Sequence, residues 1–161
     1  MYHRGEWLPL TRAQWRSVME LLPNSLSFRV VNTIDVADDA EIPPGFTGRV
    51  RRTFASEQRY VAWYTEGCLD DPTRSQPAYR VHRASGRVKY EMHYRNGMLD
   101  DADARTPAVR GFFASGGVHY EERYRNGRRH DGPKGEAAVR KWRADGTLRH
   151  ELRYHDGVRR L

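Results

Sequence analysis

Cysteine is almost absent from this chain, which has one, Cys68, in 161 residues. A single thiol cannot form an internal disulfide or supply a multi-thiolate metal site, so disulfide-stabilised secreted domains and cysteine-based zinc modules are excluded, and we expect a cytoplasmic protein. Long apolar runs are also missing. No stretch of about 18 apolar residues occurs and the first ten residues hold no continuous apolar segment, so we expect neither a membrane span nor a signal peptide.

Acidic residues are outnumbered by basic ones. The 28 Lys and Arg against 21 Asp and Glu give a net charge of +7, which argues against acidic mimicry of nucleic acid. The charge is uneven, because the first 48 residues carry a net −2 and the remainder +9. We therefore divide the chain into an N-terminal helix-strand cap, 1–45, and a basic array, 46–161, packed together as one domain.

The array repeats with a period of 30 residues. Two columns of glycine, one of tyrosine, one of glutamate and one of arginine keep this step. They are Gly67, Gly97, Gly127 and Gly157; Gly86, Gly116 and Gly146; Tyr64, Tyr94, Tyr124 and Tyr154; Glu91, Glu121 and Glu151; and Arg80, Arg110 and Arg140. The repeat units are about 46–75, 76–106, 107–136 and 137–161, and in the first of them the turn glycine is lost after Ser56.

Each unit has the sequence pattern of a β-hairpin. In residues 88–94, apolar and aromatic side chains alternate with charged ones, and this period of two is typical of a strand. Pairs such as Asn96-Gly97 and Asp145-Gly146 tolerate the positive φ that tight turns require. We predict a mainly β protein, an antiparallel β-meander of about four hairpin repeats and roughly nine strands, as a single-layer or curled sheet.

Two hairpin registers remain open. A two-residue loop places Arg80, Arg110 and Arg140 opposite Glu91, Glu121 and Glu151. A three-residue loop instead places His82, Phe112 and Trp142 beside Val88, Val118 and Leu148. A slip of one residue exchanges the two faces of a strand, so the two registers predict different surfaces.

The N-terminal cap has helical spacing. Thr11 to Gln14 form a capping-box pattern, and apolar residues follow at helical intervals from Trp15, which predicts one α-helix over 11–22. Alternation then predicts a strand over 26–36, followed by a strand at about 46–54. We expect the helix to pack on the first unit, where Val61 and Trp63 occupy positions that are charged in later units.

The repeat motif is best seen in Ala138-Val-Arg-Lys-Trp-Arg-Ala-Asp-Gly-Thr-Leu-Arg-His-Glu-Leu-Arg-Tyr-His-Asp-Gly157. It resembles the variant MORN repeat of bacterial and phage proteins, many of which are described as antitoxins. The resemblance covers about 46–161. It implies stacked hairpins in a single-layer sheet that serves as a binding scaffold without activity of its own.

Catalytic, metal and cofactor sites are not expected. His82, His93, His119 and His150 replace aromatic or basic residues in their columns, as His82 does beside Phe112 and Trp142, so we expect no metal and no cofactor. No serine or cysteine nucleophile has a specified base, so we do not expect an enzyme. The loop aspartates lack the spacing of a calcium loop, and we expect solvated carboxylates. These are Asp70, Asp71, Asp100, Asp101, Asp103 and Asp131.

Binding is therefore expected to depend on surfaces. The favoured partner is a protein with an acidic surface, the alternative is nucleic acid, and an anionic membrane surface ranks third. An exposed tyrosine-rich face could also join copies of the chain. The candidate binding residues are Arg87, Lys89, His93, Arg95, His119, Arg123, Arg125, Arg149, Arg153, His155 and Trp142.

Overall fold

The computed structural model describes residues 2–3, 6–7, 32–36 and 41–161, and every regular element in this part is a β-strand. The prediction of a mainly β protein is confirmed. The helix expected over 11–22, its packing on Val61 and Trp63, and residues 26–31 of the expected strand lie outside the described residues. No helix in the described part is long and apolar enough to span a bilayer.

Short strands follow one another along the whole described chain. They are β1 (Tyr2–His3), β2 (Glu6–Trp7), β3 (Thr33–Val36), β4 (Gly48–Thr53), β5 (Arg59–Thr65), β6 (Cys68–Leu69), β7 (Tyr79–His82), β8 (Val88–Met92), β9 (Tyr94–Arg95), β10 (Met98–Leu99), β11 (Val109–Phe112), β12 (Val118–Glu122), β13 (Tyr124–Arg125), β14 (Arg128–Arg129), β15 (Val139–Trp142), β16 (Leu148–His155) and β17 (Val158–Arg160).

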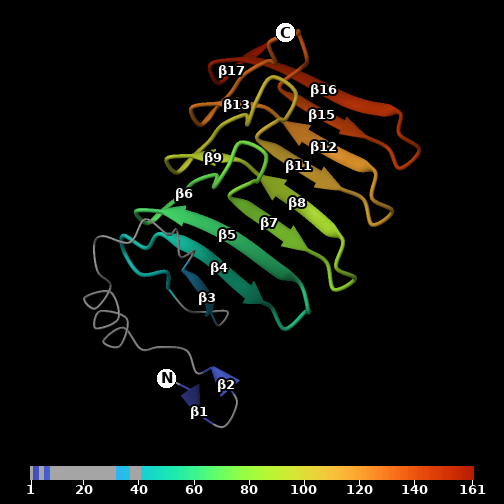
Figure 1. Ribbon diagram of the computed structural model, residues 1–161. Helices are drawn as coiled ribbons and strands as arrows, with labels where there is room; N and C mark the ends of the chain where they lie inside the picture. Colours follow the sequence, from blue (N-terminus) through green and yellow to red (C-terminus); the bar gives the residue numbers. More distant parts are fainter. Residues whose placement is uncertain (1, 4–5, 8–31, 37–40) are drawn as a thin grey trace.

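One 11-stranded sheet organises the described chain. Its order is β17-β16-β15-β12-β11-β8-β7-β5-β4-β3, with β6 beside β5, and Figure 1 shows the strands following one another from β3 to β17. Pairings from β4 onward are antiparallel. Three two-stranded sheets complete the set: β1 with β2, β9 with β10, and β13 with β14.

The first edge of the sheet differs from the expected meander. There β3 and β4 pair in parallel, with Ile34 beside Val50. Both aliphatic side chains are buried, at 5% and 0% exposure. The sheet is mainly antiparallel, as predicted, but the expected antiparallel meander does not extend to this edge, where parallel strands place two core residues side by side.

Both of the predicted hairpin registers occur, in different parts of the same hairpin. Arg80 lies opposite Glu91, whereas His82 lies opposite Val88, and the register shifts between Val81 and His82. The same shift occurs in the β11–β12 and β15–β16 hairpins. A β-bulge adds one residue to the second strand, in this hairpin Lys89, so neither single register was sufficient.

The loop between the two strands of each long hairpin closes in the same way. Arg83 N–H donates to Arg87 O at 2.8 Å, and Gly86 N–H donates to Arg83 O at 2.9 Å. In the first unit Phe54 N–H donates to Gln58 O and Glu57 N–H to Phe54 O, both at 2.8 Å. Glu57 therefore occupies the place of the turn glycine, with φ of 59°. The first loop retains its length and has replaced its glycine.

A second, smaller hairpin follows each of the later long ones. Asn96 and Gly97, which join β9 to β10, have φ of 50° and 76°, as the type I′ turn requires. The N–H of Gly97 donates to Leu69 O, and that of Gly127 donates to Leu99 O. These bonds link successive small hairpins, which lie along one side of the sheet in Figure 1.

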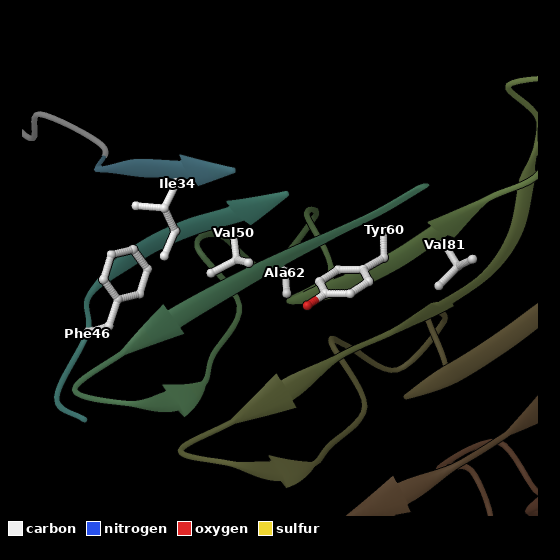
Figure 2. Packing of buried hydrophobic residues seen from close by; sticks show 6 residues of the cluster. All are labelled: Ile34, Phe46, Val50, Tyr60, Ala62 and Val81. Carbon is white, nitrogen blue, oxygen red and sulfur yellow. The ribbon is translucent and has the colours of Figure 1, made fainter. Parts of the chain in front are cut away.

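The apolar core lies at the β3 end of the sheet. Figure 2 shows the buried cluster, and partly buried aromatic residues such as Tyr79 and Tyr90 pack against it. Burial decreases along the sheet, and Leu148 of β16 is 46% exposed. The cluster consists of Ile34, Phe46, Val50, Tyr60, Ala62 and Val81.

We predict that Glu57→Gly stabilises the protein. A side chain in the left-handed region is strained, and glycine removes that strain while adding freedom to the unfolded chain, so the expected net gain is about 0.5–1 kcal/mol. Chemical denaturation measures it. The matched control is Gly86→Glu, where a Cβ meets nothing within 4 Å, so that only the backbone cost changes. Equal stability of both variants would contradict this account of the first loop.

Candidate binding surface

Arginine and glutamate alternate across the face that carries the predicted basic residues. Arg80 Nη2 lies 2.9 Å from Glu91 Oε2, and Arg110 Nε lies 3.0 Å from Glu121 Oε1. Arg140 Nη2 approaches the other oxygen of Glu121 at 2.8 Å. This charge ladder crosses the sheet from β7 to β16, so many of its arginines already have an internal counter-ion.

Three aspartates join neighbouring units through hydrogen bonds. Asp101 Oδ1 accepts the N–H of Ala108 at 2.8 Å and the N–H of Tyr124 at 3.0 Å. Asp71 and Asp131 accept the corresponding N–H groups 30 residues away on either side. We call this arrangement the aspartate clamp. Its carboxylates are at most 20% exposed, so the expectation of solvated carboxylates is wrong for Asp71, Asp101 and Asp131.

The second oxygen of each clamp meets a residue from the predicted binding set. Asp71 Oδ2 lies 2.6 Å from His93 Nδ1, and Asp101 Oδ2 lies 2.8 Å from Arg123 Nη1. The His93 and Arg123 side chains are only 4% and 3% exposed. The structure thus places these two residues inside the clamp, where a partner has no access to them.

The clamp is weakest in the last unit. Asp131 Oδ2 lies 3.7 Å from Arg153 Nη1, and the Arg153 side chain is 47% exposed. The Arg153 guanidinium also donates to Gly135 O at 2.9 Å.

Burial raises the pKa of the Asp101 carboxyl above its ordinary value, against the lowering effect of the Tyr124 and Ala108 N–H groups and of Arg123.

Several other predicted residues make contacts within the sheet. Arg87 donates to Ala114 O at 2.8 Å, and Lys89 donates to Gln58 Oε1 at 3.0 Å. Arg95 lies 3.3 Å from Asp100 Oδ2. The Arg87 and Lys89 side chains connect neighbouring hairpins, whereas Arg95 contacts an aspartate of its own small hairpin, so part of the predicted basic surface is engaged internally.

The aromatic candidates are also engaged with neighbours. His119 packs on Phe113, with ring centroids 4.3 Å apart, and the Arg140 guanidinium lies 5.2 Å from the Trp142 ring centroid. His155 lies beside His130, with ring centroids 4.7 Å apart. The structure therefore distributes the histidine candidates over three different environments.

Arg125 and Arg149 are the candidates that remain open. Both are exposed, and neither side chain makes a hydrogen bond or an ion pair with another residue in the described part of the chain. They lie on different strands, β13 and β16. The structure thus does not unite the predicted set into one continuous patch.

The tyrosine-rich face is partly covered by its own neighbours. Tyr60, Tyr79 and Tyr90 stack in a row, with centroid distances of 5.2 and 6.1 Å. Burial raises the pKa of the Tyr79 hydroxyl, and the Tyr90 hydroxyl beside it adds to this effect. Farther along, the Tyr120 ring lies over Gly111, where a Cβ would collide with the ring. Glycine is required at position 111 because the Tyr120 ring approaches the backbone so closely, and not because the φ angle there excludes other residues.

Charge and exposure are concentrated at the C-terminal hairpin. Residues 137–161 contain seven Lys and Arg against three Asp and Glu, a net +4 of the total +7. On the outer edge of β16, β17 pairs with Arg153 to His155. No strand in the described part pairs with the outer edge of residues 148–152. Glu151, 44% exposed, ends the charge ladder, and its Oε1 lies 3.8 Å from Nη2 of Arg153 on the same strand.

The comparisons with known proteins return no match. Neither the protein-family models, nor the curated proteins, nor the solved structures contain a significant relative of this chain.

Sequence reasoning missed the aspartate clamp. The signal was present, because Asp71, Asp101 and Asp131 keep the 30-residue step, as do Ala78, Ala108 and Ala138 seven residues later. Assigning the aspartates to loops led to the expectation of solvent exposure. A repeated polar column beside a repeated alanine column is the pattern that indicates a buried hydrogen-bond acceptor.

We predict that Asp→Asn substitution at the clamp has different costs in successive units. In Asp101→Asn the buried Arg123 guanidinium loses its counter-ion, and we expect a loss of about 3 kcal/mol. In Asp71→Asn the amide oxygen still accepts both N–H groups and the amide nitrogen can donate to the His93 ring, so the loss should stay below about 1 kcal/mol. Urea unfolding measures both. Equal losses would show that the second oxygen of the clamp contributes little.

Proposed function

We propose that this chain is a non-enzymatic protein-binding scaffold whose C-terminal hairpin, β15–β16 with β17, receives a net acidic segment of a partner protein. The observation that carries the proposal is the unpaired outer edge of β16 at residues 148–152, for which the described chain offers no partner strand. A free edge of this kind is a template for an added strand, and main-chain hydrogen bonds then supply affinity.

Charge supports an acidic partner. The hairpin region 137–161 carries a net +4, and Arg149 on the edge strand has no internal partner in the described residues. Interfaces of complementary charge associate faster and reject like-charged competitors. Exposed apolar side chains at the same end, Leu148 at 46% and Val158 at 69%, add area that a partner can cover.

We further propose that residues 46–161 form variant MORN repeats. The bulged hairpins, the glycine turns and the aspartate clamps, each spaced by 30 residues, support this assignment. Through that resemblance the specific role we propose is inhibition of a partner, such as an antitoxin exerts, in the cytoplasm of a bacterium or of a phage-infected cell. The free thiol of Cys68 accords with a reducing compartment.

Nucleic-acid binding is the second candidate, because Arg125 and Arg149 are exposed and free of internal polar partners in the described chain. The charge ladder weakens this candidate, since Arg80, Arg110 and Arg140 already face glutamates. An anionic membrane surface ranks third, because it would use the same few arginines without support from a basic amphipathic helix in the described part.

Blocking the edge should abolish partner binding. The direction of the Glu151 N–H follows from the preceding unit, where Arg123 N–H donates to Ala138 O on the next strand. Arg153 is the equivalent of Arg123 in the last unit, so its N–H points outward. Glu151 lies two residues before Arg153 on the same strand, so its N–H points the same way. Glu151→Pro removes that donor and leaves the β15 side intact. In affinity capture from the source cells, we expect one stoichiometric companion to be retained by the parent protein and by Arg125→Glu. The companion should be lost with Glu151→Pro. Equal retention by all three proteins would overturn the edge proposal.

The salt dependence of nucleic-acid binding separates the second candidate. We expect no DNA or RNA binding by fluorescence anisotropy at about 50 mM salt and micromolar protein. Binding that weakens tenfold or more by about 200 mM salt, and that Arg125→Glu with Arg149→Glu removes, would instead establish the nucleic-acid function. Arg123 is unsuitable for this test because its side chain is 3% exposed and reversal would disrupt the clamp.

A further inference from the structure

Three positions leave the 30-residue pattern at one place in the fold. Position 130 is histidine where the two preceding units have Asp70 and Asp100. Position 155 is histidine where they have Arg95 and Arg125, and position 156 is aspartate where they have Asn96 and Asn126. All three departures introduce side chains that ligate metal ions in proteins.

The structure brings these three side chains together. His130 Nδ1 lies 3.1 Å from Asp156 Oδ1, and His155 Nε2 lies 3.6 Å from Asp156 Oδ2. The ring centroids of the two histidines are 4.7 Å apart. One possible ligand atom from each residue falls within 4.8 Å of the other two. The repeat pattern alone does not reveal this cluster, because its members come from three different columns.

The distances fit an ion after a small side-chain adjustment. Ligands held at about 2.0–2.2 Å around a tetrahedral ion lie about 3.4 Å from one another. His130 is the least exposed member, with its side chain 11% exposed; its Nδ1 accepts the Asp156 N–H at 3.2 Å, and this hydrogen bond would be exchanged for the ion. His155 and Asp156 are 55% and 56% exposed, so their side chains can rotate inward.

A metal ion at this place would act where the sheet is weakly held. The preceding clamps close at 2.6 and 2.8 Å, whereas Asp131 and Arg153 are 3.7 Å apart. His130 lies in the loop that leaves β14, and His155 ends β16. An ion bound to both would join the third unit to the last hairpin, which is what the preceding units achieve with the clamp.

We propose that His130, His155 and Asp156 bind one divalent transition-metal ion of the Zn²⁺ class, with water completing the coordination, and that this ion fastens the terminal hairpin. Two imidazoles with one carboxylate favour such ions over Mg²⁺ or Ca²⁺, which prefer sets composed of oxygen. The proposal is independent of the partner-binding function.

The test is a titration of the tag-free protein with Zn²⁺, followed by calorimetry and by thermal unfolding. We expect one ion per chain bound at or below about 100 µM free Zn²⁺, a rise in melting temperature, and no effect of Mg²⁺. Binding should weaken on acidification from about pH 7.5 to about pH 5.5, because protons compete for imidazole nitrogens.

The chain itself offers the matched variant. His130→Asp with His155→Arg and Asp156→Asn restores the residues that the preceding units use, where Asp100 Oδ1 accepts the Asn126 N–H at 2.9 Å. It should fold and lose Zn²⁺ affinity by at least about tenfold. His155→Arg alone, at an exposed position, is the second variant, and His119→Lys is the control that should bind like the parent. Absence of Zn²⁺ binding by the parent, or equal binding by the restored variant, would overturn the site.

Discussion

The clamp aspartate is the interaction on which the rest of the sheet depends. Its Oδ1 accepts two N–H groups, one at the start of the next long hairpin and one in the adjoining small hairpin, as Asp101 does with Ala108 and Tyr124. Buried N–H groups without an acceptor are costly. One carboxylate therefore fixes where the next unit begins, and the alanine at that point, with 0% exposure at Ala108, leaves room for the close approach.

Each hairpin in this sheet is stabilised mainly by the hairpins that lie beside it in the strand order. The large apolar cluster lies only at the β3 end of the described sheet, so later units depend on other contacts: close packing such as the Tyr120 ring over Gly111 on one face and the arginine-glutamate ladder on the other. Arrays that contact only their neighbours behave as nearly one-dimensional systems. The last hairpin, with one neighbour and the loosest clamp, is then the unit with the least support.

The sequence predicted the strands well because alternation, turn residues and the period all indicated the same hairpins. It could not choose a register, since a bulge at Lys89 and its equivalents satisfies both pairings in turn. The parallel pairing of Ile34 with Val50 was missed because apolar alternation is the same for either strand direction. The candidate site was predicted less well. His93 and Arg123 share a strand parity with exposed cations, and only the loop aspartates folding over them explain their burial.

Repetition itself gives a criterion for separating packing from function in this chain. A residue that recurs every 30 positions makes an equivalent contact in successive units, as Arg80 and Arg110 do in the ladder and as the clamp aspartates do through Oδ1, so its presence is explained by the sheet. A residue that differs from the others at its position in the repeat is not explained by that shared contact. At Glu57 the departure costs strain without a compensating side-chain contact in the turn, so it is best explained as tolerated change. At His130 and His155 two departures coincide in space, next to the weakest clamp and on the hairpin whose edge lacks a partner strand in the described chain. Packing within the array does not explain why two departures meet at one place. The terminal hairpin is therefore the part of the array where a role beyond packing is best sought.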